Sequence, residues 1–189
     1  MHGPAFRNFA ESTAADWQRI ASLCEVHERA LADRVLGELK KLQGNTFGFP
    51  VDRYEHSLQT ATRAFRNGAD EETVVCALLH DIGDELAPYA HGDLAAVILK
   101  PYVSEENAWI VSKHAIFQGY HYFHHIGRDR DERERYRGHP HFEKCAAFCE
   151  RWDQAAFDRD YDTMPLSAFE PMVRRVFARP PFGGAAAAA

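Results

Sequence analysis

The apolar residues of this chain recur with the period of an α-helix in one segment after another, and strand-like alternation is nowhere sustained. The periodic segments are separated by residues that begin or end helices, among them Asp52, Gly68 and Pro101. We therefore expect an all-α fold. About seven helices are predicted, and they occupy residues 13–44, 52–67, 70–83, 91–100, 104–120, 140–156 and 167–180.

Capping residues set the expected ends of the first and last helices. Thr13 is a good N-cap, and the helical period runs from there without a break to Gly44. Ser167 followed by Glu170 has the pattern of a capping box, which opens the last helix. This start places Pro171 in the first turn, where its missing N–H removes no hydrogen bond.

Length and composition are typical of one soluble domain. The chain has 189 residues, of which 46% are hydrophobic and 26% are charged. A chain of this size buries enough apolar surface for a core without disulfides or structural metals. We expect residues 1–182 to form a single domain, and the Gly-Gly and alanine tail at 183–189 to lie outside it.

Charge and hydropathy exclude several classes of partner. The net charge of -6 argues against binding to nucleic acid or an anionic membrane surface, and no run of 18 apolar residues predicts a membrane span. Residues 1–13 lack a secretory signal, and the four cysteines form no CxxC pair. We therefore expect a cytoplasmic protein, present as a monomer or a small homo-oligomer.

The segment 70–83 is apolar nearly all round, which predicts a buried helix, yet it ends in His80 and Asp81. A charged carboxylate at the end of such a helix is unfavourable unless it is paired or bound to a metal. Adjacent helical residues point about 100° apart, so His80 and Asp81 do not approach one metal from the same direction. Asp81 can instead span two metals, with one oxygen on each.

Four histidines are placed so that they face one another in pairs. His56 and His80 each lie twelve residues from Gly68, so in an antiparallel hairpin both stand about 18 Å from the turn. His91 and His114 lie about eleven and twelve residues from the turn at 101–102. Asp153, beside aromatic and small residues, is a candidate sixth ligand. Mixed imidazole and carboxylate ligands suit iron, manganese, zinc or cobalt.

His56, the doublet His80–Asp81 and the distant Asp153 together resemble the signature of the HD-domain superfamily of metal-dependent enzymes. The segment 77–83 is close to the commonest form of that motif, and His91 and His114 match its dinuclear branch. The compact spacing is most similar to the mixed-valent diiron oxygenases, such as the organophosphonate oxygenases, with inositol oxygenase more distant. The resemblance covers residues 51–156 and implies a helical bundle around a dinuclear metal site.

This resemblance also implies a reaction. Two iron ions, one ferrous and one ferric, would be held by the six ligands, although other divalent metals are compatible with the set. The ferrous ion would bind O2 and the ferric ion a hydroxyl of a small substrate, whose adjacent C–P or C–C bond breaks. Asp81, between the metals, is the expected catalytic residue.

The residues expected around the substrate differ from those of the phosphonate oxygenases. Those enzymes have functional groups ten and seven residues before the first ligand histidine, where this chain has Thr46 and Phe49. They have a lysine four residues after the last ligand histidine, where this chain has Gln118, and a histidine after the His-Asp-Ile-Gly motif, where it has Asp84. The metal scaffold therefore carries over better than the substrate pocket.

The aromatic and histidine-rich run at 118–125 has two interpretations. Its rings pack on the core, or Gln118, Tyr120 and His121 line the substrate pocket one or two turns beyond His114, together with Asp84. Two other functions use the same ligands. A phosphohydrolase would activate a bridging water against a nucleotide or another phosphate ester. A non-catalytic module would only bind the metal.

Overall fold

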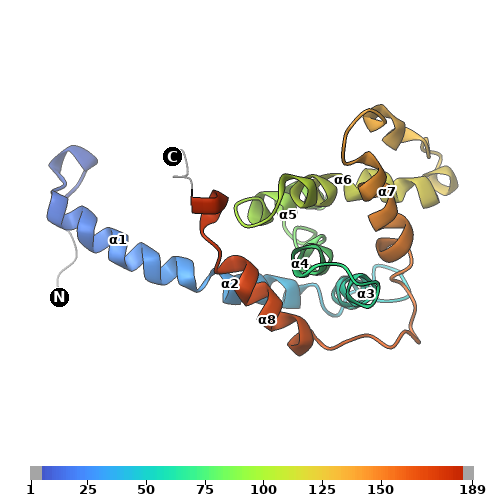
Figure 1. Ribbon diagram of the computed structural model, residues 1–189, viewed down its shortest axis with the longest axis horizontal. Coiled ribbons are helices and arrows are strands. Elements are labelled where there is room, and N and C mark those ends of the chain that lie inside the picture. The colour runs from blue at the N-terminus through green and yellow to red at the C-terminus, as the bar shows by residue number, and fades with distance from the viewer. Residues whose placement is uncertain (1–5, 185–189) are drawn as a thin grey trace.

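The computed structural model describes residues 6–184, and every regular element in that range is a helix, as the sequence predicts (Figure 1). Short helical turns η1 (Phe9–Glu11), η2 (Phe123–Ile126), η3 (Glu132–Tyr136) and η5 (Pro181–Gly184) and a π-helix η4 (Cys149–Asp153) connect or extend the α-helices. The α-helices in this range are α1 (Ala14–Arg29), α2 (Leu31–Lys41), α3 (Arg53–Arg66), α4 (Glu71–Leu79), α5 (His91–Leu99), α6 (Glu105–Tyr122), α7 (Phe142–Phe148) and α8 (Leu166–Phe177).

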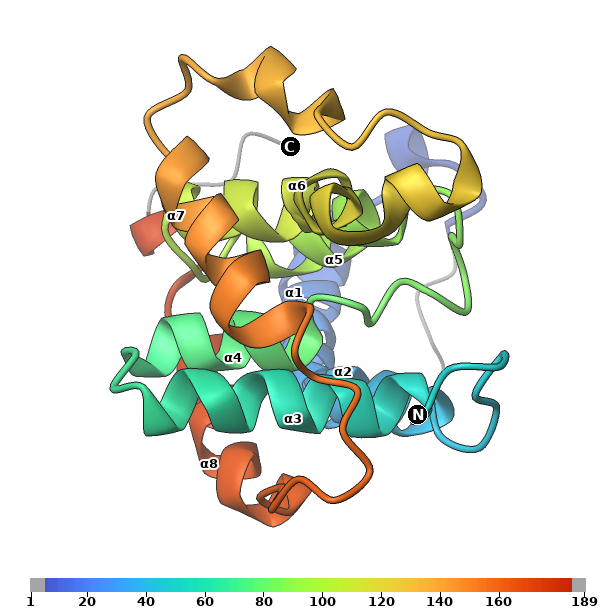
Figure 2. The same ribbon diagram turned by 90° about the vertical axis from the view of Figure 1, so that its right-hand side faces the viewer.

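Two antiparallel hairpins, α3–α4 and α5–α6, form the body of the molecule, and α4 packs on α6 where the hairpins meet. Figure 2 shows α7 crossing from the α5–α6 layer to the α3–α4 layer, and η4 continues it against α3. Helices α2 and α8 pack on each other, α2 against α3 and α8 against α4. This arrangement leaves α4 surrounded by other helices on all sides.

Local sequence signals position the hairpins. Asp52, Asp70 and Ser104 cap α3, α4 and α6, each with its side-chain oxygen accepting a hydrogen bond from the backbone N–H three residues later. Gly68 ends the α3 side of its hairpin with φ of +77°, in the left-handed region that glycine adopts without strain. The predicted turn therefore forms where the histidine spacing requires it.

The core is built around α4, whose residues Val74 to Leu79 are all buried. Burial continues into α3, where the hydroxyls of Thr60 and Thr62 donate to the backbone carbonyls of His56 and Leu58 at 2.8 and 2.7 Å. Because these hydroxyls are satisfied within their own helix, α3 can bury a polar face against the rest of the molecule.

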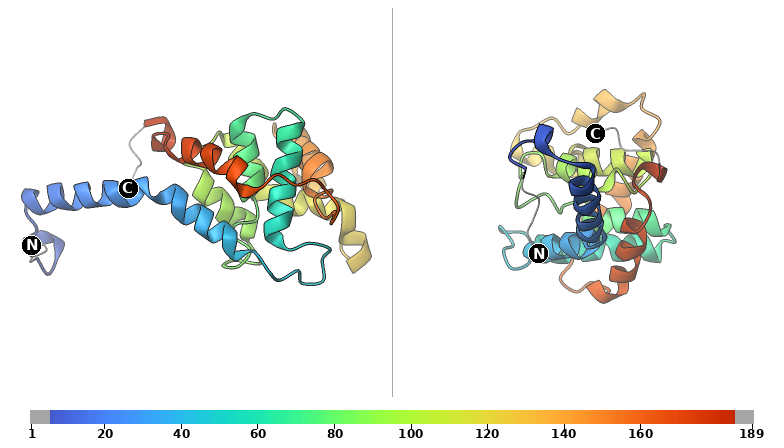
Figure 3. Two further views of the ribbon diagram at one scale, coloured as in Figure 1. Left: turned by 90° about the horizontal axis from the view of Figure 1, so that it is seen from below. Right: turned by 90° about the vertical axis from the view of Figure 1, so that its left-hand side faces the viewer.

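The predicted helix 13–44 is wrong in one respect, because the structure divides it into α1 and α2 at Ala30. Helix α2 packs on the body, whereas α1 buries no side chain and extends away from it (Figure 3). Leu23 and Val26 on α1 are 62% and 67% exposed. No glycine or proline marks the break, so the helical period alone could not reveal it.

The predicted capping box at Ser167 does not form. Helix α8 begins one residue earlier, at Leu166, and its N-cap Pro165 makes no side-chain hydrogen bond. Pro171 therefore lies inside the helix rather than in its first turn. Pro165 has the extended backbone that is usual for an N-cap residue, so it takes the N-cap position that was predicted for Ser167.

The expected domain limits extend beyond the part of the chain that the structure describes, since residues 1–5 and 185–189 lie outside it. The boundary at 182 falls within η5, whose Phe182 N–H donates to the carbonyl of Pro101 at 2.6 Å. Cys76, Cys145 and Cys149 are buried free thiols, and Cys24 is an exposed one. Among residues 6–184, no helix combines the length and the apolar character needed to cross a membrane.

Candidate metal centre

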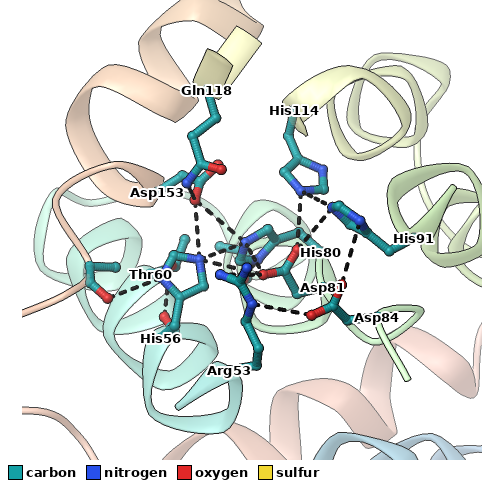
Figure 4. A network of polar contacts seen from close by, with 12 residues as sticks. Arg53, His56, Thr60, His80, Asp81, Asp84, His91, His114, Gln118 and Asp153 are labelled. Carbon is teal, nitrogen blue, oxygen red and sulfur yellow. Dashed lines mark hydrogen bonds and ion pairs between the residues drawn. The ribbon is translucent and has the colours of Figure 1, made fainter. Parts of the chain in front are cut away.

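Six side chains converge in the interior, where the two hairpins and η4 meet (Figure 4). Their donor atoms form overlapping groups of three, within each of which all atoms lie within 4.8 Å of one another. They come from α3, the turn after α4, the first residue of α5, α6 and η4. These are the six predicted ligands: His56, His80, Asp81, His91, His114 and Asp153.

We divide the side chains around Asp81 into two groups, and the first, here called the inner cluster, consists of His56, His80 and Asp153, all fully buried. The Nε2 atom of His56 lies 3.1 Å from Nε2 of His80 and 3.1 Å from Oδ1 of Asp153. Nε2 of His80 lies 3.6 Å from the same carboxylate oxygen. Three donor atoms thus surround one small volume.

The second group, here called the outer cluster, consists of His91 and His114, whose Nε2 atoms are 3.2 Å apart. Oδ1 of Asp81 lies 3.4 Å from Nε2 of His91 and 3.2 Å from Nε2 of His114. Its other oxygen, Oδ2, lies 3.6 Å from Nε2 of both His56 and His80. The carboxylate of Asp81 therefore stands between the two clusters, with one oxygen toward each.

Hydrogen bonds to the backbone fix which ring nitrogen faces the centre. In three of the imidazoles Nδ1 lies close to a carbonyl oxygen: His56 with Ala156 at 3.0 Å, His80 with Ala77 at 2.8 Å and His114 with Val111 at 2.7 Å. A carbonyl only accepts, so Nδ1 carries the proton and donates it. When one of these three rings is neutral, its Nε2 atom carries no proton, and the lone pair of that atom points into the centre.

The donor atoms fit metal ions. Bare Nε2 lone pairs 3.1 and 3.2 Å apart, beside carboxylate oxygens, repel one another unless a cation lies among them. Ligand atoms about 2.1 Å from a metal, at tetrahedral or octahedral angles, are about 3.0–3.4 Å apart. Oδ2 of Asp153 is buried and has no hydrogen-bond partner among the described residues, so it too can serve as a ligand atom.

Both carboxylates are held in the charged form. Without a metal, a ring that takes a second proton on Nε2 can donate to these carboxylates: burial alone would raise the pKa of Asp81, but the positive field of protonated His80 and a hydrogen bond from protonated His114 hold it well below its ordinary value. Burial would raise the pKa of Asp153 too, but in the same protonated state hydrogen bonds from Nε2 of His56 and His80 outweigh it and lower that pKa. Two ionised carboxylates among imidazole nitrogens form a binding site for cations.

The turn after α4 sets the directions of His80 and Asp81. The predicted helix 70–83 is too long, because α4 ends at Leu79 and both residues belong to the turn that follows. His80 is the C-cap of α4 and keeps right-handed helical backbone angles, with φ of −60° and ψ of −31°, so the divergence expected of neighbouring helical residues still applies to this pair. The two side chains still diverge, which allows Asp81 to stand between the clusters.

Two glycines allow the outer cluster to close. A Cβ at Gly83 would lie 2.5 Å from the carbonyl oxygen of His91, and a Cβ at Gly92 would lie 2.8 Å from that of Val111. The same Cβ at Gly92 would stand 3.1 Å from the ring of His114. The turn, α5 and α6 approach one another closely here only because both residues lack a side chain.

Asp153 enters the centre from a π-helix, a feature that the predicted α-helix 140–156 did not include. Helix α7 ends at Phe148, and in the next turn Gln154 N–H donates to the carbonyl of Cys149, five residues back, at 3.0 Å. Single π turns inside helices occur frequently at functional sites. Here the turn carries the last of the six side chains.

The four predicted substrate residues have different surroundings. Gln118 donates from Nε2 to Oδ1 of Asp153 at 2.6 Å, so it borders the inner cluster. Asp84 borders the outer cluster, with Oδ1 3.6 Å from Nδ1 of His91. Tyr120 is covered by the guanidinium groups of Arg130 and Arg133, 4.2 and 3.6 Å from its ring centre. His121 faces Glu150, with Nε2 3.6 Å from the carboxylate.

Sequence reasoning missed Arg53 and Phe157. Nη1 of Arg53 lies 3.9 Å from Oδ2 of Asp81 (Figure 4), and the ring of Phe157 stacks on that of His56 at 4.4 Å. Arg53 stands three residues before His56 on α3, and that spacing on one helix face could have identified it. Phe157 lies beyond η4, in irregular backbone that no periodicity describes.

Comparison with known proteins agrees with this geometry. The model of the HD domain matches residues 53–154, a range that contains all six converging side chains. The chain is also 28% identical over 159 residues to a [1-hydroxy-2-(trimethylamino)ethyl]phosphonate dioxygenase (glycine-betaine-forming) from Leisingera caerulea. That match covers 68% of this chain and 81% of the relative.

The family match spans more than half of the chain and begins and ends with the elements that form the centre. The similarity to a phosphonate dioxygenase associates the chain with the oxygenases among these metal-binding enzymes. The described helices, the convergence of the histidines and aspartates, and the family match therefore agree. The chain belongs to the HD-domain family.

Proposed function

We propose that this protein is a diiron oxygenase that uses O2 to cleave a C–P or C–C bond of a small hydroxylated substrate. The observation that carries the proposal is the carboxylate of Asp81, which stands between two clusters with one oxygen toward each. This is the arrangement that two neighbouring metal positions require. The similarity to an enzyme named as a hydroxyphosphonate dioxygenase favours oxygenase chemistry.

Under this proposal all six converging side chains hold iron, and the two positions are not equivalent. The inner cluster has His56, His80, Asp153 and one oxygen of Asp81, whereas the outer cluster has only two imidazoles and the other oxygen. With one protein ligand fewer, the outer position would leave an ion held there more coordination sites for exchangeable ligands. A bound pair of irons supplies the one-electron and dioxygen chemistry that no side chain provides.

The protein's own residues hold and shield this site. The Nδ1–carbonyl hydrogen bonds fix the imidazoles before any metal binds, so the donor geometry is already formed. Phe157 covers His56 and keeps water from the inner cluster. Gln118 and Asp84, which border the two clusters, are proposed to contact substrate.

The second candidate is a metal-dependent phosphohydrolase, for which Arg53 is the specific observation. A guanidinium 3.9 Å from the central carboxylate would suit a phosphate ester as well as a phosphonate. In that reaction manganese or another divalent ion replaces iron, and a water activated between the metals attacks phosphorus. The ligand geometry is the same for both reactions, so the redox state of the metal separates them.

The decisive experiment is metal analysis combined with two parallel assays. Protein loaded with iron and partly reduced is tested for O2 uptake with 1-hydroxyphosphonates, including the substrate named for the relative, and with polyols. The same protein is examined for a mixed-valent paramagnetic signal at liquid-helium temperature. We expect O2 uptake with at least one hydroxylated substrate and a signal that changes when that substrate is added.

The opposing assay measures phosphate release from nucleotides and phosphate esters without oxygen, with manganese in place of iron. Robust anaerobic phosphate release without O2 uptake for any substrate would overturn the oxygenase proposal in favour of the hydrolase. An Asp81→Ala variant is the control in both assays, because it removes the group shared by the two clusters.

A further inference from the structure

Arg53 stands at the boundary between the metal centre and solvent. It is the first residue of α3, three residues before His56, and its side chain is 23% exposed. Nη1 lies 3.9 Å from Oδ2 of Asp81, while Nε donates to Oδ2 of Asp84 at 3.1 Å. The guanidinium therefore reaches the central carboxylate from the outside.

The guanidinium is held in place from two directions. Asp84 accepts from Nε on one side, and on the other the ring of Phe49 lies under Cζ, with 4.5 Å to its centre. Phe49 stacks on Phe157 at 5.5 Å, and Phe157 stacks on His56 at 4.4 Å. This chain of contacts fixes Arg53 relative to the inner cluster, so little rotational freedom is lost when it binds a ligand.

Most of the donors of Arg53 remain available. A guanidinium has five N–H groups, and one of them, on Nε, is used by Asp84. Within residues 6–184, neither Nη atom makes a hydrogen bond, because the carboxylate of Asp81 is too far away. Two Nη groups in one plane match the two oxygens of a phosphonate, phosphate or carboxylate.

A cavity of about 380 Å³ opens beside this guanidinium. That volume suits a small molecule. Arg53 is the cationic residue in the lining, which otherwise contains aromatic rings, a proline and two acidic side chains: Phe47, Phe49, Asp84, Glu85 and Pro88. An anionic ligand in this cavity would meet Arg53 next to the central carboxylate.

Positive charge is absent from the two predicted substrate residues that border the centre. Gln118 is neutral and donates to Asp153, and Asp84 is acidic. A cationic side chain beside the centre would attract an anionic substrate. Arg53 supplies that charge from α3, on the opposite side of the centre from Gln118 (Figure 4).

We propose that Arg53, positioned by Asp84, binds the oxyanion of the substrate beside the carboxylate of Asp81. The shared chemistry is a planar or tetrahedral group with at least two terminal oxygens, as in a phosphonate or a carboxylate. This inference rests on the proposed function, because it takes the ligand to be the substrate of that reaction. Binding of an anion to Arg53 can nevertheless be measured without turnover. Asp84 is then a positioning residue, because it acts through Arg53.

The test compares Arg53→Gln and Arg53→Lys with the control Arg66→Gln. Arg66 lies on the same helix and pairs with Asp162 at 2.7 Å on the surface, so its loss removes an equal charge away from the centre. Metal-loaded protein of each variant is titrated calorimetrically with methylphosphonate, inorganic phosphate and acetate. Metal content is measured on the same samples.

We expect Arg53→Gln to bind the preferred anion about ten- to a hundredfold more weakly with unchanged metal content. Arg53→Lys should be intermediate, since an ammonium group offers charge without the bidentate geometry, and Arg66→Gln should match the parent protein. In turnover, the loss should appear as a higher KM with little change in kcat. Asp84→Asn should raise KM in the same direction, by a smaller factor.

Unchanged anion affinity in Arg53→Gln overturns the proposal. Loss of metal in that variant overturns it as well, because Arg53 would then act on Asp81 rather than on substrate. If acetate binds to the parent protein more tightly than methylphosphonate does, and Arg53→Gln loses that binding, the proposal is supported and the oxyanion is a carboxylate. If Arg53→Gln loses anion affinity while the parent protein shows no O2 uptake, the assignment of Arg53 to anion binding is kept and only the oxygenase proposal fails.

Discussion

The two clusters of the centre contain similar donor atoms but differ in how firmly the fold holds them. The inner imidazoles are fully buried, and both donate from Nδ1 to backbone carbonyls at 3.0 Å or less. In the outer cluster the side chain of His91 is 21% exposed, and its Nδ1 lies 3.5 Å from the carbonyl of Pro88. Under the proposed function, we therefore expect the inner position to retain its metal ion and the outer position to exchange ligands.

The same contrast extends to the surroundings of each cluster. Phe157 and Gln118 border the inner cluster, whereas Asp84 borders the outer one and pairs with Arg53, and both of these charged side chains reach solvent. Burial lowers the pKa of His91, so this imidazole is neutral and able to bind a metal despite its exposure. Under the proposed function, such a centre would keep one ion fixed while ligands enter and leave at the other.

The largest effect is expected from Asp81→Ala. This variant should lose the metal ions of both clusters, so that the two clusters no longer differ in metal retention. It removes the carboxylate that faces all four imidazoles and should also lower the free energy of unfolding, by about 3 kcal/mol. Elemental analysis and thermal unfolding measure the two losses. The matched control is Asp93→Ala, an exposed carboxylate on α5. Retention of even one metal by Asp81→Ala would contradict a shared ligand.

The second prediction compares His56→Ala with His91→Ala. Each should reduce the metal content from about two ions per chain toward one. His56→Ala should also destabilise the fold by about 2–4 kcal/mol, because it leaves a cavity in the core, whereas His91→Ala should cost less than about 1 kcal/mol. Denaturant unfolding of the metal-free variants separates the two. Equal destabilisation would mean that the clusters do not differ in rigidity.

The third prediction concerns Gln118→Ala, at the border of the inner cluster. The variant should keep both metals and raise the KM of the substrate about tenfold, because the amide is lost from the pocket while Asp153 keeps its imidazole partners. Steady-state kinetics and metal analysis measure this. Loss of iron would instead assign Gln118 to the orientation of Asp153.

The smallest effect on the centre is expected from Glu72→Gln, at the far end of α4. Glu72 accepts hydrogen bonds from Ser104 N–H at 2.6 Å, Asn107 at 2.9 Å and Arg179 at 2.5 Å. Burial opposes ionisation, but these donors outweigh it and lower the pKa of Glu72 from 4.5 to about 2. The variant should lose about 1–3 kcal/mol of stability at neutral pH and no metal.

The pH dependence of Glu72 has a definite sign. Because the pKa is lower in the folded protein, the carboxylate stabilises the fold above about pH 4.5, and this contribution disappears as the pH falls toward about 2. The stability difference between the parent protein and Glu72→Gln should therefore narrow over that range. Denaturant unfolding at a series of pH values checks this, and a constant difference would contradict it.

The sequence predicted the hairpins and the four histidines because both depend on spacing along helices, whereas Asp81 and Asp153 were predicted from their apolar neighbours and from the resemblance to the HD-domain superfamily. Equal distances from Gly68 place His56 and His80 at the same height whatever the rest of the fold does. The break at Ala30 and the π-helix before Asp153 were not predictable in this way, since each depends on packing between distant segments. The contacts of Arg53 with Phe49 and Asp84 likewise join a helix to two loops.

The close approach at Gly83 and Gly92 has a consequence for genetics. Neither residue has a side chain to bind a metal or a substrate, yet any larger residue would move the backbone that carries His91 or press on the ring of His114. In a saturation scan scored by activity, both positions should tolerate no substitution, alongside the six ligands. Inactivating substitutions at these two glycines would therefore mark the outer cluster as clearly as inactivating substitutions at His91 and His114 do.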